Sequence, residues 1–170
     1  MKLIIFLFTF LFIIENSAQA CKKCDLVNFP KGYEPKEVGA RLSERFLESS
    51  HLLHGGKWIH YAEVCTWYGA LRFAETVQDQ GLITKLQMRF DSLCLKEKEL
   101  LPIMNHVDLN MFGCLPLELY KVTGNQAYLK LGMPYANSQW EIPNNPKPYE
   151  LAWHNKGYSW QTRLWIDDMF

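Results

Sequence analysis

The sequence has no excess of charge of either sign. Its 170 residues include 18 Lys and Arg and 18 Asp and Glu, so the formal net charge at pH 7 is zero. Without a basic field to attract phosphate, the composition excludes a nucleic-acid-binding protein and a protein that binds anionic lipid through charge. Hydrophobic residues make up 48% of the chain, which excludes a disordered tail and a collagen-like chain.

Several motifs of enzyme chemistry are absent as well. The sequence contains no G-x-S-x-G serine-hydrolase motif, no G-x-x-x-x-G-K phosphate loop and no G-x-G-x-x-G dinucleotide motif. Its five histidines form no H-E-x-x-H pair, and the C-x-x-C pair of Cys21 and Cys24 lacks a second pair that would complete a zinc site. We therefore expect no metal and no cofactor. The other cysteines, Cys65, Cys94 and Cys114, lie in helical apolar patterns and are predicted to be small core residues.

The one long hydrophobic run lies at the start of the chain. Lys2 is followed by a twelve-residue run, Leu3–Ile14, that is apolar except for Thr9, and then by Ala18-Gln19-Ala20. A basic start, a short apolar run and an A-x-A site are typical of a secretory signal peptide. A helix of this length covers about 18 Å, less than the hydrocarbon core of about 30 Å, so the run is too short for a transmembrane anchor.

The sequence thus predicts an exported protein, periplasmic or secreted, with a signal peptide at residues 1–20. Cleavage after Ala20 would make Cys21 the first mature residue. This leaves open a lipid anchor on Cys21, as in an outer-membrane lipoprotein.

The rest of the pattern is helical, with almost no strand signal. Apolar residues recur at helical spacing in five segments. We expect Gly81 to end the second segment, Pro102 to stop the third, Gly124 to close the fourth and Pro134 to kink or limit the fifth. The first predicted helix starts at about Pro35 (with Val38, Leu42, Phe46). The other four run from Val64 to Val77 (with Trp67, Tyr68, Leu71, Ala74), from Leu82 to about Glu99 (with Leu86, Phe90, Leu93), from Val107 to Val122, and from about Gln126 to Trp140 (with Tyr128, Leu131, Tyr135, Ala136).

Short turns between consecutive helices favour antiparallel neighbours, so the pattern predicts an all-α fold of stacked helical hairpins. A simple bundle remains open. Polar and aromatic residues gather in one set of connections, before the fourth helix and after the fifth, and this favours a toroid of hairpins with its ligand at one end. Three prolines between positions 143 and 148 predict an extended, exposed loop.

Two carboxylates could carry chemistry. Asp108 directly precedes an apolar helical face, where an aspartate commonly serves as a helix N-cap. Asp167 and Asp168 are adjacent, so on a helix they point about 100° apart and only one can enter a given site. The same stretch is rich in groups that stack on sugars or pair with a carboxylate, namely Trp153, His154, Tyr158, Trp160, Gln161, Arg163 and Trp165. A histidine such as His154 more often has a structural role than a catalytic one. His51 and His54 have no carboxylate neighbour in the sequence.

Four segments together resemble a known family. They are H-Y-A-E-V-C-T-W-Y-G-A-L (60–71), H-V-D-L-N-M-F-G (106–113), Y-A-N-S-Q-W (135–140) and G-Y-S-W-Q-T-R-L-W-I-D-D-M-F (157–170). With its W-x-D motif at Trp165–Asp167, the chain is similar to glycoside hydrolase family 105 and its relative, family 88. These families contain unsaturated rhamnogalacturonyl and glucuronyl hydrolases.

The resemblance implies an (α/α)6 six-hairpin toroid that removes a terminal 4,5-unsaturated uronic acid from oligosaccharides made by polysaccharide lyases. In that mechanism a carboxylic acid protonates the enol-ether double bond, water adds to the resulting cation, and the hemiketal opens. By motif position, Asp167 is the acid/base, Asp108 the second aspartate, Trp165 the ring beside the acid, and His154 a substrate-binding histidine. We add Arg163 as a partner for the uronate carboxylate and leave Asp168 as structural.

The length differs from that of the family. Its members are roughly twice as long, so residues 21–170 are expected to be the N-terminal part of a six-hairpin domain, about half of it, and to be inactive alone. Two alternatives stay open: a non-catalytic carbohydrate-binding module on the same scaffold, and a helical-repeat interaction protein.

Overall fold

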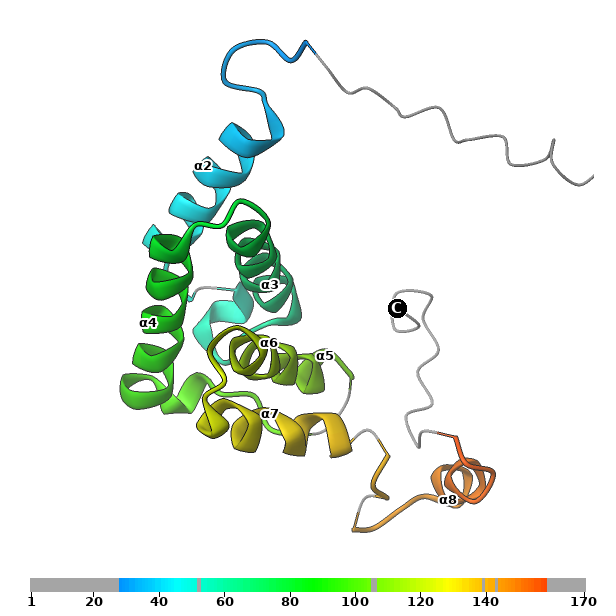
Figure 1. The fold of residues 1–170 in the computed structure, drawn as a ribbon. Coiled ribbons are helices and arrows are strands. Elements are labelled where there is room, and N and C mark those ends of the chain that lie inside the picture. Colours follow the sequence, from blue (N-terminus) through cyan, green and yellow to red (C-terminus); the bar gives the residue numbers. More distant parts are fainter. Residues whose placement is uncertain (1–27, 52, 105–106, 139, 143, 159–170) are drawn as a thin grey trace, which may run out of the picture. The chain divides into compact units, whose positions relative to one another are not determined.

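The computed structural model describes residues 28–51, 53–104, 107–138, 140–142 and 144–158. These residues form helices and turns, with no strand among them (Figure 1). The predicted all-α class is therefore confirmed for this part of the chain. The helices, with η marking a 3₁₀ helix, are α2 (Pro35–Glu48), η1 (Leu53–Gly56), α3 (Tyr61–Thr76), α4 (Gln80–Lys96), η2 (Lys98–Leu100), α5 (Val107–Asn110), η3 (Met111–Gly113), α6 (Cys114–Thr123), α7 (Gln126–Ser138) and α8 (Pro148–His154).

The chain divides into two units, Met1–Glu34 and Pro35–Phe170. In the first unit, residues 28–34 form a turn in which the Tyr33 amide donates to the Pro30 carbonyl at 2.9 Å. All the helices named above belong to the second unit. The predicted signal peptide, Cys21 and Cys24 lie outside the described residues. Within the described ranges, no helix combines the length and the apolarity that crossing a membrane requires.

A tight turn joins α3 to α4 and makes the first hairpin. Gln78 adopts a left-handed conformation, with φ of 58°, which reverses the chain. The Asp79 carboxylate then accepts a hydrogen bond from the Leu82 amide at 2.9 Å and so caps the start of α4. The prediction that Gly81 ends the preceding helix is wrong, because this glycine already lies in the first turn of α4.

A second tight turn joins α6 to α7. Gly124 has φ of 70°, and its amide donates to the Tyr120 carbonyl at 2.7 Å, which closes α6 as predicted. The segment before this turn is less regular than expected, because the predicted single helix Val107–Val122 is interrupted by η3. Pro134 lies inside α7 without ending it, and α7 stops at Ser138, two residues before the predicted end.

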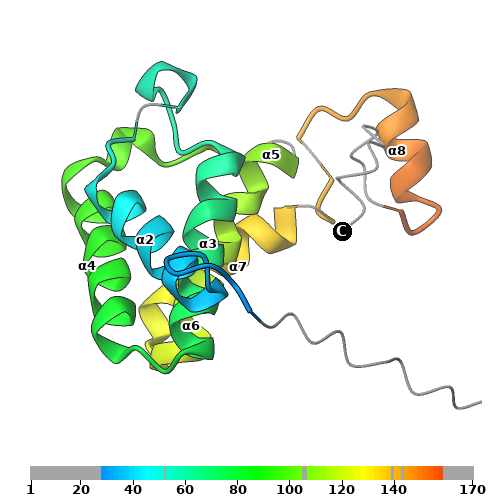
Figure 2. The same ribbon diagram turned by 90° about the horizontal axis from the view of Figure 1, so that it is seen from above.

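The two hairpins place their short turns and their long connections at opposite ends. Helices α3 and α4 pack together, α6 and α7 pack together, and α3 packs on α6. Figure 2 shows that α3 and α6, which pack on each other, run in roughly the same direction, and that α4 and α7 return in the opposite one. The turns at 77–79 and 124–125 therefore lie at one end, and the longer connections that lead into α3, into α5 and out of α7 lie at the other.

Two hydrogen bonds join the segments at the end with the long connections. The Ile59 amide, just before α3, donates to the Leu100 carbonyl, just after α4, at 2.8 Å. The Tyr135 hydroxyl of α7 donates to the Pro102 carbonyl at 2.7 Å. The residues that precede α3 and α5 are thus held close to one another.

A row of aromatic rings crosses the core from α2 to α7. Successive ring centroids, from Phe46 through Trp67, Phe90 and Phe112 to Tyr135, lie 5.3, 5.8, 5.9 and 5.2 Å apart. Each of these residues is buried. Rings at such spacings attract one another beyond the free energy of simple burial, so this row joins α2, α3, α4, η3 and α7 in one core.

Most of the predicted core stripes are confirmed. Val64, Trp67, Leu71 and Ala74 of α3 are buried, and so are Leu82, Leu86, Phe90 and Leu93 of α4. The predicted stripe members Leu42, Tyr68 and Ala136 are exposed instead. The prediction that the cysteines are core residues is wrong for Cys65 and Cys114, which are exposed, while Cys94 is half-buried.

Helix α8 was not expected, because the prolines between positions 143 and 148 suggested a loop. Pro148 occupies the first turn of α8, where a missing N–H costs nothing. The Lys147 amide before it donates to the Glu150 carboxylate at 2.6 Å. The third proline therefore starts a helix rather than extending the loop.

Two mid-helix glycines should respond oppositely to alanine. At Gly132 of α7, an added Cβ would lie 2.6 Å from Leu117 Cγ of α6, whereas at Gly69 of α3 it would meet nothing within 4 Å. We expect Gly132→Ala to lower the free energy of unfolding by about 1–3 kcal/mol through overpacking. Gly69→Ala should raise it by about 1 kcal/mol through helix propensity. Urea titrations of both variants measure the two changes in the free energy of unfolding. Equal changes of the same sign would contradict the close approach of α6 and α7.

Candidate functional site

Asp108 is the one predicted catalytic residue in the described part of the chain. It is half-buried and is the second residue of α5, so it contributes a negative charge to the first turn of this short helix rather than capping it from outside. The predicted N-cap role is therefore wrong. Because α5 leads through η3 into α6, Asp108 lies at the end of the hairpins where the long connections gather.

The other predicted site residues divide between α8 and the undescribed C-terminal segment. His154 is half-buried and is the last residue of α8. Near it, the rings of Trp153 and Tyr158 lie 5.5 Å apart. Asp167, Trp165 and Arg163 lie outside the described residues, so the meeting of Asp108 with Asp167 stays a prediction.

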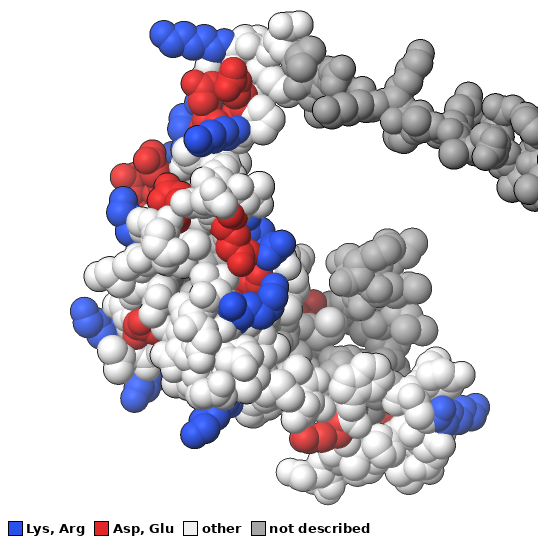
Figure 3. Space-filling model, viewed as in Figure 1, with Lys and Arg blue, Asp and Glu red and all other residues white. Residues whose placement is uncertain are grey.

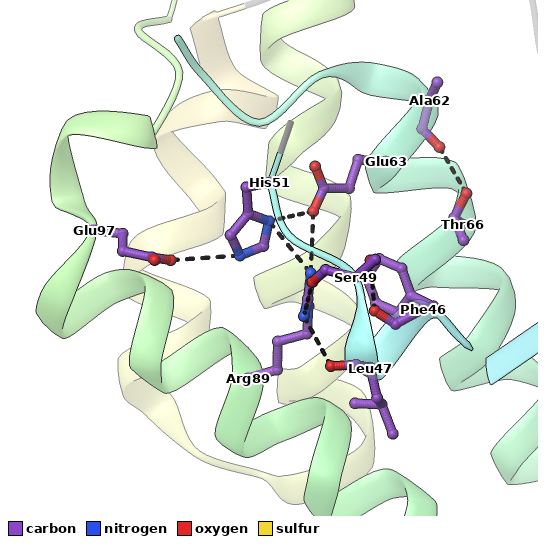
Figure 4. Close-up of polar contacts among 9 residues, drawn as sticks. All are labelled: Phe46, Leu47, Ser49, His51, Ala62, Glu63, Thr66, Arg89 and Glu97. Carbon is purple, nitrogen blue, oxygen red and sulfur yellow. Dashed lines mark hydrogen bonds and ion pairs between the residues drawn. The ribbon is translucent and has the colours of Figure 1, made fainter. Parts of the chain in front are cut away.

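A buried polar cluster that the sequence analysis missed lies at the start of α3 (Figure 4). Glu63, in the first turn of α3, is only 6% exposed, and its Oε1 atom contacts Nδ1 of His51. The other ring nitrogen of His51, Nε2, lies 3.5 Å from Oε2 of Glu97 at the end of α4. His51 has no carboxylate neighbour in the sequence, but folding brings Glu63 to it from twelve residues further along the chain.

Arg89 of α4 completes this cluster. Its Nη2 atom lies 3.6 Å from Glu63 Oε1, and its Nη1 atom donates to the carbonyls of Leu47 and Ser49 at 3.1 and 2.9 Å. Those two carbonyls belong to the end of α2, where backbone acceptors lack partners within the helix. One guanidinium therefore binds the carboxylate of α3 and the C-terminal end of α2 together.

The surroundings of the Arg89 guanidinium are largely apolar. Its central carbon lies 4.6 Å from the ring centroid of Phe46 and 5.4 Å from that of Trp67, which are cation–π distances. Burial lowers the pKa of Arg89, and the negative charges of Glu63 and Glu97 oppose that shift. Arginine nevertheless remains a cation at neutral pH, so the buried Glu63 carboxylate has a permanent counter-charge.

A groove between α2 and α3 opens beside the cluster. Its volume is about 730 Å³, and its walls are mostly apolar, with Phe46 from α2 and Phe73 from α3. The Glu63 side chain also lines it. At its far end, Gly39 of α2 approaches Phe73 so closely that an added Cβ would lie 2.4 Å from the ring. The groove is therefore mostly apolar, with the charged residues Glu63 and Arg45 among its lining.

The geometry of the cluster favours a structural role over proton transfer. A histidine that acts as general base needs a free ring nitrogen, and here Nδ1 faces Glu63 while Nε2 faces Glu97. The described residues hold no group of three or more His, Cys, Asp or Glu side chains that could bind a metal ion. The cluster joins α2, α3 and α4 at the same end of the hairpins as Asp108, and so fixes the position of the helices beneath the long connections.

One sequence signal could have revealed this cluster. Arg89 lies three residues after Leu86 and four before Leu93, inside the apolar stripe of α4, and Glu63 lies four residues before Trp67 in the stripe of α3. Opposite charges within two core-facing stripes predict a buried pair, because a lone buried charge is too costly. On the face of the molecule drawn in Figure 3, charges of both signs are interspersed, in keeping with the balanced composition.

Comparisons with known proteins do not extend this picture: no family model, no curated protein and no solved structure matches the chain.

Proposed function

We propose that this chain is part of an exported glycoside hydrolase of the family 105 and 88 type. The enzyme would remove a 4,5-unsaturated uronic acid from oligosaccharides of the pectin or rhamnogalacturonan type. The proposal rests on the resemblance of four sequence segments, which are distributed between residues 60 and 170. It includes a six-hairpin toroid, of which α3–α4 and α6–α7 would be two consecutive hairpins.

The position of Asp108 is the structural observation that supports this proposal. The residue assigned as second aspartate lies in the first turn of α5, at the end of the hairpins where the Ile59 amide donates to the Leu100 carbonyl and so joins the connections into α3 and α5. In a toroid of hairpins, a ligand site is built from one such set of connections. If Asp108 lay instead on a tight turn or within a core stripe, its position would not fit a site of this kind.

In the proposed reaction, Asp167 donates a proton to the carbon–carbon double bond of the uronate ring, and the ring oxygen stabilises the resulting cation. The Asp167 carboxylate then accepts a proton from the water that adds to the cationic carbon. The hemiketal formed opens and releases the sugar that was linked to it. Asp108 would assist, because a second carboxylate nearby favours the protonated form of an acid, and Trp165, His154 and Arg163 would bind the substrate.

The decisive experiment follows the ultraviolet absorbance of the substrate double bond. The complete open reading frame that contains this chain is expressed without residues 1–20 and mixed with unsaturated disaccharides. We expect the absorbance to fall with time, and Asp167→Asn to slow that fall by about 10²–10⁴-fold, the usual contribution of a general acid. Asp168→Asn, the neighbouring carboxylate, is the matched control and should keep nearly full activity.

Each alternative function has its own outcome in this experiment. Calorimetric binding of the disaccharide without loss of absorbance would support a non-catalytic carbohydrate-binding module. The absence of both binding and turnover would favour a helical-repeat interaction protein. Full activity of Asp167→Asn would disprove the assigned catalytic acid.

A further inference from the structure

Helices α3 and α6 lie side by side, and one ion pair fixes their register. Arg72 of α3 donates through Nη1 to Oε1 of Glu118 of α6 at 3.0 Å. The Lys121 ammonium also contacts the Glu118 carboxylate, with 2.9 Å between Nζ and Oε2. Since the two helices run in the same direction, residues that precede Arg72 on α3 face residues that precede Glu118 on α6.

Two cysteines occupy matching positions in this register. Cys65 lies seven residues before Arg72, which is about two turns, and Cys114 lies four residues before Glu118, which is about one turn. Whole turns return a side chain to nearly the same face, so both thiols lie on the flank that carries the ion pair. The three-residue difference between seven and four corresponds to about 4.5 Å along the helix axis.

The different lengths of the Arg72 and Glu118 side chains reduce this offset of Cys65 and Cys114 along the helix axes. Helical side chains lean toward the N-terminus, and arginine is longer than glutamate, so the backbone of Arg72 lies further toward the C-terminal end than that of Glu118. Cys65 is thereby brought toward the level of Cys114. Packed helices with axes about 8–10 Å apart bring directly facing Cα atoms to about 3.4–5.4 Å. Because both cysteines lie on an exposed flank, their Cα atoms are separated by more than this and by no more than about the distance between the axes, an interval that includes the 4.4–6.8 Å range of disulfides.

Electrostatics agrees with this proximity. The pKa of the Cys114 thiol is raised by partial desolvation among its neighbours, and then by the charge of Cys65 and that of Glu118. Both cysteine residues are exposed, so a small reagent can reach them. Cys94 differs from the pair: it is half-buried on α4, and burial raises its thiol pKa to about 11.

We propose that Cys65 and Cys114 form a disulfide bond between α3 and α6 when the protein meets a small-molecule disulfide such as oxidised glutathione. One cysteine thiolate attacks the reagent, which gives a mixed disulfide and releases one reduced thiol. The second cysteine, as thiolate, displaces the other half of the reagent. The two cysteines together lose two protons and two electrons, and the reagent is reduced to two thiols. This inference does not depend on the proposed hydrolase function.

Peptide mapping without reduction tests the bond. The full chain is purified reduced, equilibrated with oxidised glutathione, alkylated to block remaining thiols and digested with trypsin. Cleavage after Lys and Arg places Cys65 in peptide 58–72, Cys94 in peptide 90–96 and Cys114 in peptide 99–121, so the three cysteines are separated. We expect peptides 58–72 and 99–121 to be linked in the monomer fraction from size exclusion, and peptide 90–96 to be alkylated.

Matched variants decide between this pair and other pairings. Cys94→Ser should leave the link intact, and Cys65→Ser and Cys114→Ser should each abolish it. The oxidised wild-type chain should also unfold at a higher temperature than the reduced one, and the Cys65→Ser chain should lose that difference. A folded protein that keeps both thiols alkylated, or that links either cysteine to Cys21, Cys24 or a second chain, would overturn the proposal.

Discussion

Replacing Arg89 by methionine is expected to lower the free energy of unfolding by about 3–5 kcal/mol, the usual cost of removing one partner from a buried ion pair. The variant would leave the Glu63 carboxylate, 6% exposed, without its permanent counter-charge. It would also remove the donor to the carbonyls of Leu47 and Ser49 at the end of α2. Methionine keeps most of the apolar contact with Phe46, so the loss reports mainly on charge and hydrogen bonding.

Urea or thermal unfolding followed by circular dichroism measures this effect. For a chain of this size, each 1 kcal/mol corresponds to about 2–4 °C in melting temperature, so the fall should be roughly 6–20 °C. Arg41→Met on the exposed face of α2 is the matched control, with an expected change within about 0.5 kcal/mol. Glu97→Gln should cost less than about 1 kcal/mol, because Glu97 is 45% exposed. Equal losses in all three variants would show that the cluster is not a buried network.

Phe90→Ala is expected to lower the free energy of unfolding by about 3–5 kcal/mol as well, but by a different mechanism. The Phe90 ring is completely buried, and its centroid lies 5.8–5.9 Å from those of Trp67, Phe112 and Tyr128. Truncation removes the centre of the aromatic row and leaves a cavity among α3, α4, η3 and α7. Trp67 and Phe112, the rings on either side, would then each lose one of their two ring contacts in the row.

The control for this variant is Met88→Ala on the same helix. Met88 is 65% exposed, and its truncation should change the free energy of unfolding by no more than about 0.5 kcal/mol. Near-ultraviolet circular dichroism adds a second measurement, since loss of Phe90 should weaken the signal of the packed rings while Met88→Ala should not. A small effect of Phe90→Ala on both measurements would contradict a single core that extends from α2 to α7.

Helical periodicity was enough to locate the packed helices but not their ends. The stripes of α3 and α4 follow from apolar spacing, and Gly124 ends α6 because a left-handed residue without a side chain is favoured there. Gly81 carried the same sequence signal, yet the chain reverses three residues earlier. Gln78 accepts the left-handed conformation in its place, and Asp79 caps the next helix. A choice between neighbouring turn residues depends on tertiary packing, which local sequence does not contain.

The candidate site was harder to predict for a related reason. His51 and Glu63 are twelve residues apart, and Arg89 follows much later, so their meeting depends on how α2, α3 and α4 pack. The charges within the two apolar stripes were visible in the sequence, but a pairing between them requires the register of the helices. Asp108 was found through a motif and not through packing, and its position in α5 rather than before it is a detail that the motif does not specify.

The separation of short turns from long connections has a consequence for the evolution of this fold. The turns at 77–79 and 124–125 fix each hairpin tightly, so a change of length there would disturb the core directly. Insertions in a surface connection cost little free energy, because loop entropy grows slowly with length. Homologous chains can therefore be expected to differ in length mainly at the end that holds Asp108, while the lengths of the helices and of the tight turns stay unchanged.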